Sequence, residues 1–187
     1  MWILKEPYDD FIDGKPYGGG WSITKDLFRE PLKFANSSKT ARMMTYTTYG
    51  ILNNKNWNEI DYIENNPQIA DCIRQIAYIN LSKMPAEKTT SMTILKKKLK
   101  IWKPTILKQI SVYDPQILIF GNTFPLLKDD LFKEDKLPEK KDYDGYVWAY
   151  NYENKLYLWA YHPGANVKQE AYANTLIKVV NDWRTSR

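Results

Sequence analysis

The sequence predicts an α/β fold with three layers, α/β/α, around a central, mostly parallel sheet of four or five strands. Short apolar runs are typical of buried strands, and amphipathic stretches at helical spacing separate them. Strands that alternate with helices form a parallel sheet covered on both faces. No segment has the composition of a linker. The 187 residues, 43% of them hydrophobic, are therefore expected to form one domain over 1–187.

The first half of the chain is expected to contain two strands and two helices. MWIL predicts a strand at the first residues, and the prolines and glycines of KEPYDDFIDGKPYGGG predict an irregular loop after it. Ser37 or Ser38 is expected to cap the helix in SKTARMMTYTTYGILNNKNW. Pro67 lies near the start of a second helix in NNPQIADCIRQ, and IAYIN follows as a short strand.

The second half is expected to contain a long helix, a buried strand, a hairpin and a last helix. KKKLKIWKPTILKQISVYD has helical apolar spacing, and Pro104 is expected to start its regular part because a first turn tolerates proline. ILIFG follows as a strand, and KDDLFKEDKLPEKKDYDG is expected to be a charged loop. YVWAYNY and KLYLWAYHP predict a hairpin around a polar ENK turn, and KQEAYANTLIKVVNDW predicts an amphipathic helix.

Composition narrows the class of protein. The formal charge is +5 and the pI is near 9.0, a balance that suits a polyanionic partner. Cys72 is the only cysteine, which excludes an internal disulfide and a cysteine-ligated zinc or iron–sulfur site. No apolar stretch reaches the roughly 20 residues of a membrane span, and no signal-peptide pattern opens the chain. A cytoplasmic protein is expected.

Polar residues follow the predicted strands at the edge where a site is expected. The strand ends read LKEPY, INLSK, FGN and YHPGA. Ligands of open α/β sheets bind beyond the carboxyl ends of the strands. His162, the only histidine, therefore stands where a ligand is expected, directly after the last apolar run.

Four short motifs at these places resemble those of the uracil-DNA glycosylase superfamily, over nearly the full length of the chain. KEPYDD corresponds to GQDPYH of the classical members, and GGGWSI to the end of their glycine-containing loop. YINLS corresponds to the strand that ends in asparagine, and YHPGA to HPSPL. The chain differs in having glutamate for the first motif's aspartate, and in lacking the serine and leucine after the histidine.

The resemblance implies a role for each matched residue. Glu6 would face the sugar, orient the attacking water and stabilise the positive charge on the ring. His162 would donate a hydrogen bond to the base oxygen as negative charge develops there. Tyr8, Trp21 and Asn80 would bind the base: Tyr8 against carbon 5 of a pyrimidine, Trp21 by stacking and Asn80 at the base edge.

Each of these residues also has a plain structural interpretation. Taken singly, His162 is typical of a hydrogen-bonded residue at a strand end, Glu6 of a surface acid and Trp21 of a core aromatic. Asparagine commonly caps a turn, and Asn80 fits that role. For Tyr8 the sequence favours equally a place in the pocket wall and packing under the loop. It is their occurrence together, in order and at strand ends, that favours catalysis.

Backbone contacts to DNA are expected from residues that flank these motifs. Ser82 and Lys83 follow Asn80, and Gly164 and Asn166 follow His162. The lysines of KKKLK have two interpretations, as phosphate contacts or as the solvated face of a helix. Asn166 or Val167 would insert into the space that the flipped-out base leaves in the DNA base stack.

The resemblance implies a monofunctional DNA glycosylase that acts by base flipping and leaves an abasic site. Water would be the nucleophile, DNA (double- or single-stranded) the partner, and no cofactor or metal is expected in what we expect to be a monomer. The base is uracil or a modified pyrimidine, in base-excision DNA repair or in antiviral defence against a phage genome with a hypermodified base such as glucosylated hydroxymethylcytosine. The alternatives are a catalytically inactive DNA-binding member of the fold and an α/β enzyme for free nucleotides.

Overall fold

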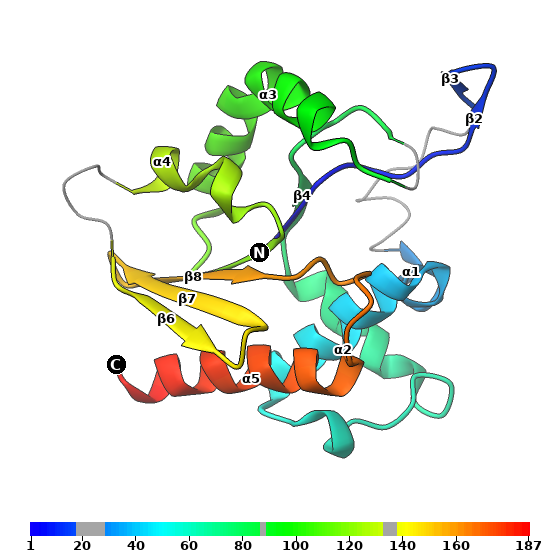
Figure 1. The fold of residues 1–187 in the computed structure, drawn as a ribbon. Helices are drawn as coiled ribbons and strands as arrows, with labels where there is room; N and C mark the ends of the chain where they lie inside the picture. The colour runs from blue at the N-terminus through cyan, green and yellow to red at the C-terminus, as the bar shows by residue number, and fades with distance from the viewer. Residues whose placement is uncertain (18–28, 87–88, 133–137) are drawn as a thin grey trace.

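The computed structural model describes residues 1–17, 29–86, 89–132 and 138–187, which form an α/β protein with helices on both faces of a mixed sheet (Figure 1). Within these residues the main sheet has six strands in the order β4-β1-β5-β8-β7-β6. In chain order the strands are β1 (Trp2–Leu4), β4 (Tyr78–Asn80), β5 (Ile117–Gly121), β6 (Lys140–Tyr143), β7 (Val147–Tyr152) and β8 (Lys155–Ala160).

Four of the six strands run in the same direction side by side. β1 is parallel to both β4 and β5, and β5 is parallel to β8. β7 pairs antiparallel with β8 and with β6. The expected hairpin is therefore confirmed, and its turn places Glu153 and Asn154 at positive φ, as a tight two-residue turn requires.

The expectation of four or five strands was wrong because β6 lies inside the segment that was expected to be a charged loop. Lys140, Lys141 and Asp142 are exposed, so this strand has no apolar periodicity to reveal it. It forms by pairing with β7 across a turn in which Asp144 and Gly145 have positive φ. Charged side chains are common on such an edge strand because they discourage pairing with other chains.

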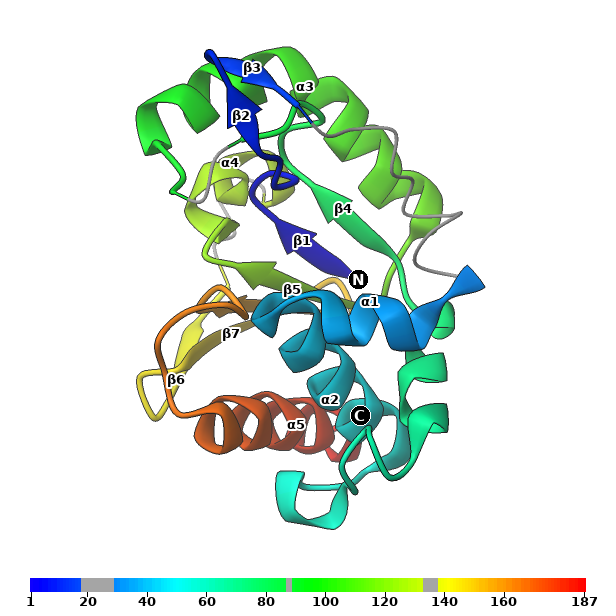
Figure 2. The ribbon, with the colours of Figure 1, turned by 90° about the vertical axis from the view of Figure 1, so that its right-hand side faces the viewer.

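The helices divide between the two faces of the sheet (Figure 2). α1 (Pro31–Ser37), α2 (Lys39–Asn53) and α5 (Gln169–Thr185) lie on one side together with the 3₁₀ segments η2 (Trp57–Glu59) and η3 (Pro67–Gln75). α3 (Met92–Tyr113), η4 (Phe124–Leu126) and α4 (Lys128–Leu131) lie on the other. This arrangement gives the layers that the sequence predicts.

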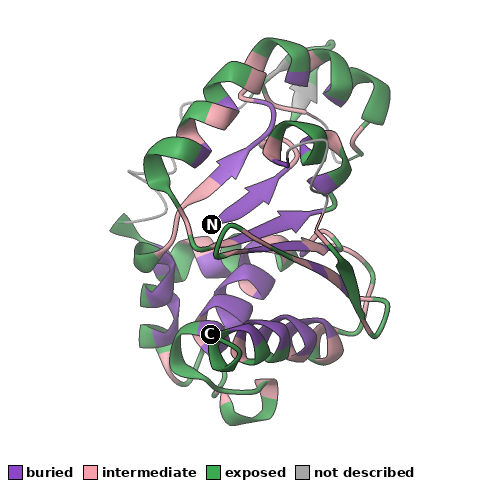
Figure 3. Cartoon of the chain, turned by 90° about the vertical axis from the view of Figure 1, so that its left-hand side faces the viewer, coloured by how far each residue is buried: buried purple, intermediate pink, exposed green. Residues whose placement is uncertain are grey.

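Strand β1 packs into both cores of the molecule. Trp2 and Leu4 join the apolar cluster under α2 and α5, whereas Ile3 joins the cluster under α3. All three side chains are buried, as the purple strands in Figure 3 show. A strand covered on both faces is apolar along its whole length, which explains why MWIL is an unbroken run.

The structure corrects three further details of the helices and loops. Pro104 lies inside α3 instead of starting it; α3 begins at Met92, with the Ser91 hydroxyl accepting a hydrogen bond from the backbone N–H of Ile94. NNPQIADCIRQ forms a 3₁₀ segment in place of the expected α-helix. The segment that was expected to be irregular contains a small hairpin, β2 (Phe11–Ile12) and β3 (Lys15–Pro16).

Of the two serines expected to cap α2, the structure selects Ser38. Its hydroxyl accepts a hydrogen bond from the Ala41 backbone N–H at 3.1 Å, whereas Ser37 belongs to the end of α1. Across the described ranges, no helix is both long enough and apolar enough to cross a membrane.

Candidate active site

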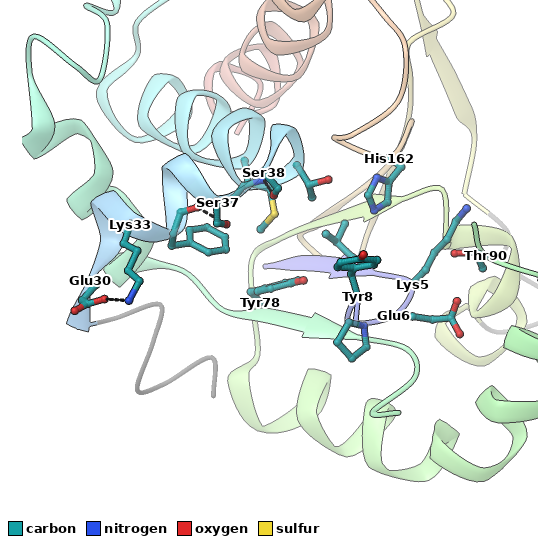
Figure 4. A pocket seen from close by; sticks show the side chains of 16 residues that line it. Lys5, Glu6, Tyr8, Glu30, Lys33, Ser37, Ser38, Tyr78, Thr90 and His162 are labelled. Atoms are coloured by element: carbon teal, nitrogen blue, oxygen red, sulfur yellow. Dashed lines mark hydrogen bonds and ion pairs between the residues drawn. The ribbon is translucent and has the colours of Figure 1, made fainter. Parts of the chain in front are cut away.

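A pocket of about 660 Å³ lies beyond the carboxyl end of β1 (Figure 4). One wall is the segment that leaves β1, from Leu4 to Tyr8, and the opposite wall is formed by α1 and the first turns of α2. Tyr78 of β4, Thr90 before α3, and His162 after β8 complete it. The segments that meet here are far apart in the sequence, and each of the three strands involved ends at this edge of the sheet.

His162 points into the pocket from the segment after β8 (Figure 4). Its Nδ1 accepts a hydrogen bond from the backbone N–H of Gly164 at 3.1 Å, so in the neutral ring the proton resides on Nε2. Burial, together with the positive charge of Lys5, lowers the pKa of His162 from 6.5 to about 4. At neutral pH the side chain is therefore an uncharged imidazole that donates through Nε2.

The chain after β8 turns toward β1 because two glycines permit close packing. A Cβ on Gly164 would lie 2.5 Å from Thr40 Oγ1 at the start of α2. A Cβ on Gly121, at the end of β5, would lie 2.4 Å from a methyl carbon of Leu4 and 3.1 Å from the ring of Pro163. The contacts of 2.5 and 2.4 Å are shorter than real Cβ atoms show, so glycine at these positions lets the segment around His162 pack closely against Thr40 and Leu4.

Glu6 lies in the pocket wall opposite α1 and has a side chain that is only 4% exposed. Its Oε1 accepts a hydrogen bond from Lys98 Nζ of α3 at 3.0 Å. Its Oε2 is buried and has no hydrogen-bond partner among the described residues. A buried carboxylate oxygen without a donor is a site for water or for a ligand.

Tyr8 also lines the pocket, and its side chain is 49% exposed. Its hydroxyl donates to the Asp10 carboxylate, and this hydrogen bond raises the pKa of Tyr8. The backbone around it is held by a bridge to the segment after β4: Asp9 N–H donates to the Ala86 carbonyl, and Ala86 N–H donates to the Pro7 carbonyl. The ring is therefore a wall of the pocket in this structure.

Asn80 lies next to the pocket but does not line it. Its side chain is buried at the end of β4, and its Oδ1 accepts a hydrogen bond from the Tyr78 hydroxyl at 3.2 Å. Tyr78, which the sequence reasoning missed, is the residue of this strand that lines the pocket, and burial raises its pKa to about 12. Its position two residues before Asn80, on the same face of the strand, is the signal that could have identified it.

The residues expected to contact the DNA backbone lie in different surroundings. Ser82 is buried, and its hydroxyl accepts from the Met84 N–H and donates to the Met84 carbonyl within one turn. Lys83 Nζ donates to the Asn80 carbonyl at 2.9 Å, and burial lowers the pKa of Lys83 to about 8. Asn166 is exposed, and Gly164 holds His162. Their contacts to DNA stay predictions, with Ser82 the least accessible of the four.

Trp21, the residue expected to stack on the base, lies outside the described residues. The three glycines before it, 18–20, lie outside them as well. The stacking role of Trp21 therefore stays a prediction.

The wall formed by α1 and α2 was not expected from the sequence. It places Phe34 and Met44 beside the hydroxyl-bearing residues Ser37, Ser38 and Thr40. An ion pair of 2.8 Å between Glu30 and Lys33 lies at the end of the pocket away from Glu6 (Figure 4). Only the serines carried a sequence signal, and that signal pointed to helix capping.

The described residues contain no group of three or more histidine, cysteine, aspartate or glutamate side chains that could hold a metal ion. What they define is an α/β protein with a carboxylate and a neutral imidazole on one pocket at the carboxyl ends of its strands. Comparison of the chain with protein-family models, with curated proteins and with solved structures finds no match.

Proposed function

We propose that the protein is a DNA glycosylase with the three-layer fold of the uracil-DNA glycosylase superfamily. It hydrolyses the N-glycosidic bond of a flipped-out uracil or modified pyrimidine and leaves an abasic site. The observation that carries the proposal is that Glu6 and His162, from opposite ends of the chain, line one pocket. The sequence motifs singled out these two residues, and the proposed reaction requires both of them to face one bound nucleotide.

The chemistry follows from the two side chains. As the bond between C1′ and the base nitrogen breaks, its electron pair moves to the base, and positive charge develops on the sugar. The neutral ring of His162 carries its proton on Nε2, because Nδ1 accepts the hydrogen bond from Gly164. This Nε2–H donates a hydrogen bond to the base oxygen on which negative charge develops. Glu6 stabilises the cationic sugar, and its Oε2 accepts a proton from the water that attacks C1′.

Binding to DNA supplies the free energy that turns the base out of the stack, a few kcal/mol. The surplus of positive charge, +5, favours the approach to a polyanion. Lys83, Gly164 and Asn166 lie on the segments that follow β4 and β8 and are our candidates for backbone contacts.

The size of the pocket favours a second candidate substrate. Its volume of about 660 Å³ is in the range of pockets for drug-sized ligands, about 300 to 1,000 Å³, and exceeds what a single pyrimidine ring fills. Ser37, Ser38 and Thr40 add hydroxyl groups at the α1–α2 wall, which suit a sugar-bearing base. Under this alternative the protein removes a hypermodified base from phage DNA in antiviral defence. The further alternative is an inactive DNA-binding member of the fold.

The test is mass spectrometry of small molecules released from three DNAs by the purified protein. One DNA contains uracil, one is a phage genome with glucosylated hydroxymethylcytosine, and one is unmodified. Release of a single base, with alkali-labile sites in the same DNA, is expected, and Glu6→Gln should lower the rate at least about 10²-fold. Release of free base from none of the DNAs would overturn the proposal, and DNA binding without release would favour the inactive alternative.

A further inference from the structure

Lys98 holds Glu6 from a part of the chain that has no place in the four motifs. It lies in the first half of α3, and its Nζ is 3.0 Å from Glu6 Oε1 and 3.1 Å from the Pro85 carbonyl. The ammonium group is thus shared between the segment after β1 and the segment after β4. These two segments also pair with each other through Pro7 and Ala86.

The surroundings of Lys98 differ from those of the other lysines in its run. Its side chain is 24% exposed, whereas Lys96, Lys97 and Lys100 are exposed on the outer face of α3. The sequence offered phosphate binding or solvation for the whole run. For Lys98 the structure shows neither, because its donors are directed at a buried carboxylate and a carbonyl.

A buried carboxylate requires compensation for the water it loses. Glu6 is 4% exposed, so its charge would be costly without an opposite charge in contact. Lys98 provides that charge at one oxygen only. Oε2, the other oxygen, has no partner among the described residues and is left as the acceptor.

We infer that Lys98 is a positioning residue: it fixes the orientation of the Glu6 carboxylate through Oε1 and thereby reserves Oε2 for the attacking water. This inference rests on the proposed glycosylase function. Lys98 acts through Glu6 and does not touch the substrate. Loss of the ammonium group leaves a buried carboxylate that is free to rotate.

The test compares Lys98→Met, Lys98→Arg and the control Lys108→Met in single-turnover base release with enzyme in excess over DNA. Lys108 is on the same helix and exposed, so its substitution removes the same charge without touching Glu6. Lys98→Met is expected to lower the rate about 10- to 100-fold, and Lys98→Arg, which keeps the cation, to recover part of it. The affinity for DNA should stay within about twofold of that of Lys108→Met.

Two readouts separate positioning from other roles. Recovery of the single-turnover rate by Lys98→Arg, which restores a cation beside Glu6 Oε1, is expected for positioning and not for a loss of packing. A phosphate contact would instead weaken DNA binding, reduce its salt dependence by about one charge and leave the single-turnover rate unchanged.

Each result decides one claim. An active wild type with equal rates for Lys98→Met and Lys108→Met overturns the role of Lys98 and leaves the glycosylase standing. A wild type that releases no base overturns the proposed function, and with it the positioning role of Lys98. If Lys98→Met does not fold, Lys98→Gln takes its place: a folded Lys98→Gln that releases base as fast as Lys108→Met overturns the inference.

Discussion

The backbone N–H of Gly164 donates a hydrogen bond to Nδ1 of His162 at 3.1 Å, which fixes the tautomer of the only histidine in the chain. The donor is part of the turn that follows β8, where the N–H of Ala165 also donates to the carbonyl of His162. Because the donor belongs to the backbone, most side-chain substitutions around the pocket leave it in place. The backbone conformation of this turn thus determines that Nε2 carries the proton that the proposed reaction requires.

Substitution of His162 tests this donor directly. We expect His162→Ala to lower single-turnover base release about 10²- to 10³-fold, as loss of one preorganised donor to a developing anion does elsewhere. His162→Gln, whose amide can also donate a hydrogen bond, should keep more activity than alanine. Fluorescence anisotropy should give DNA affinities within about twofold for all three proteins. Alanine and wild-type proteins that release base at the same rate would exclude His162 from the reaction.

Gly164→Ala is expected to displace the turn that holds His162. The new methyl group would lie 2.5 Å from Thr40 Oγ1 and 3.3 Å from Nδ1 of His162, so the Thr40 side chain, α2 or the turn must shift. Overpacking of this kind lowers the free energy of unfolding by about 1 to 3 kcal/mol, and base release should fall with it. Chemical denaturation and single-turnover assays measure the two effects.

A double variant tests whether the contact with Thr40 causes the loss of stability in Gly164→Ala. Thr40→Ala removes the oxygen that the methyl group would meet, so Gly164→Ala combined with Thr40→Ala should be more stable than Gly164→Ala alone. Strict additivity of the two substitutions would show that the clash with Thr40 is not the reason for the loss.

The parallel part of the sheet could be predicted from the sequence because burial on both faces leaves a plain signal. Trp2, Ile3 and Leu4 are all buried, and the run ILIFG of β5 is similar. β6 gave no such signal, since its exposed lysines and aspartate are strand residues only by virtue of pairing with β7. Local composition cannot reveal a strand that long-range pairing alone creates.

The same distinction holds at the pocket. Glu6 and His162 could be singled out because each lies two residues after the end of a buried strand, in a polar motif where the chain leaves the sheet. Phe34 and Met44 look like ordinary apolar positions of helices, and only the packing of α1 and α2 against the sheet turns them toward a cavity. Lys98 was hidden for the same reason, because nothing in KKKLK marks which lysine points inward.

His162 is also expected to make stability depend on pH. Its pKa is 6.5 in the unfolded chain and about 4 in the folded protein, because burial and Lys5 disfavour the charged ring. Between these values the unfolded chain binds a proton that the folded protein does not, so stability falls as the pH drops from 6.5 to 4 and levels off below. Above 6.5 this contribution does not change.

The measurement is the difference in the free energy of unfolding between wild type and His162→Gln across pH 3.5 to 7.5, which cancels the titration of other groups. The wild type should lose up to ~3 kcal/mol relative to the variant between pH 6.5 and 4, at about 1.4 kcal/mol per unit of pKa. Parallel curves for the two proteins would mean that the imidazole is not held in its neutral form.

The contact between Tyr78 and Asn80 gives a last prediction, which concerns how the base edge is read. The Tyr78 hydroxyl donates to Asn80 Oδ1 at 3.2 Å, so this tyrosine of the pocket lining orients the asparagine amide. Tyr78→Phe removes that hydroxyl and should lower the free energy of unfolding by about 1 kcal/mol. If Asn80 reads the base, freeing its amide should also lower single-turnover base release.

Tyr113→Phe, at an exposed tyrosine, is the control. The combination of Tyr78→Phe with Asn80→Ala should be no slower than Asn80→Ala alone, because the hydroxyl then has no amide to orient. A further drop in the double variant would mean that Tyr78 contributes to base release without Asn80.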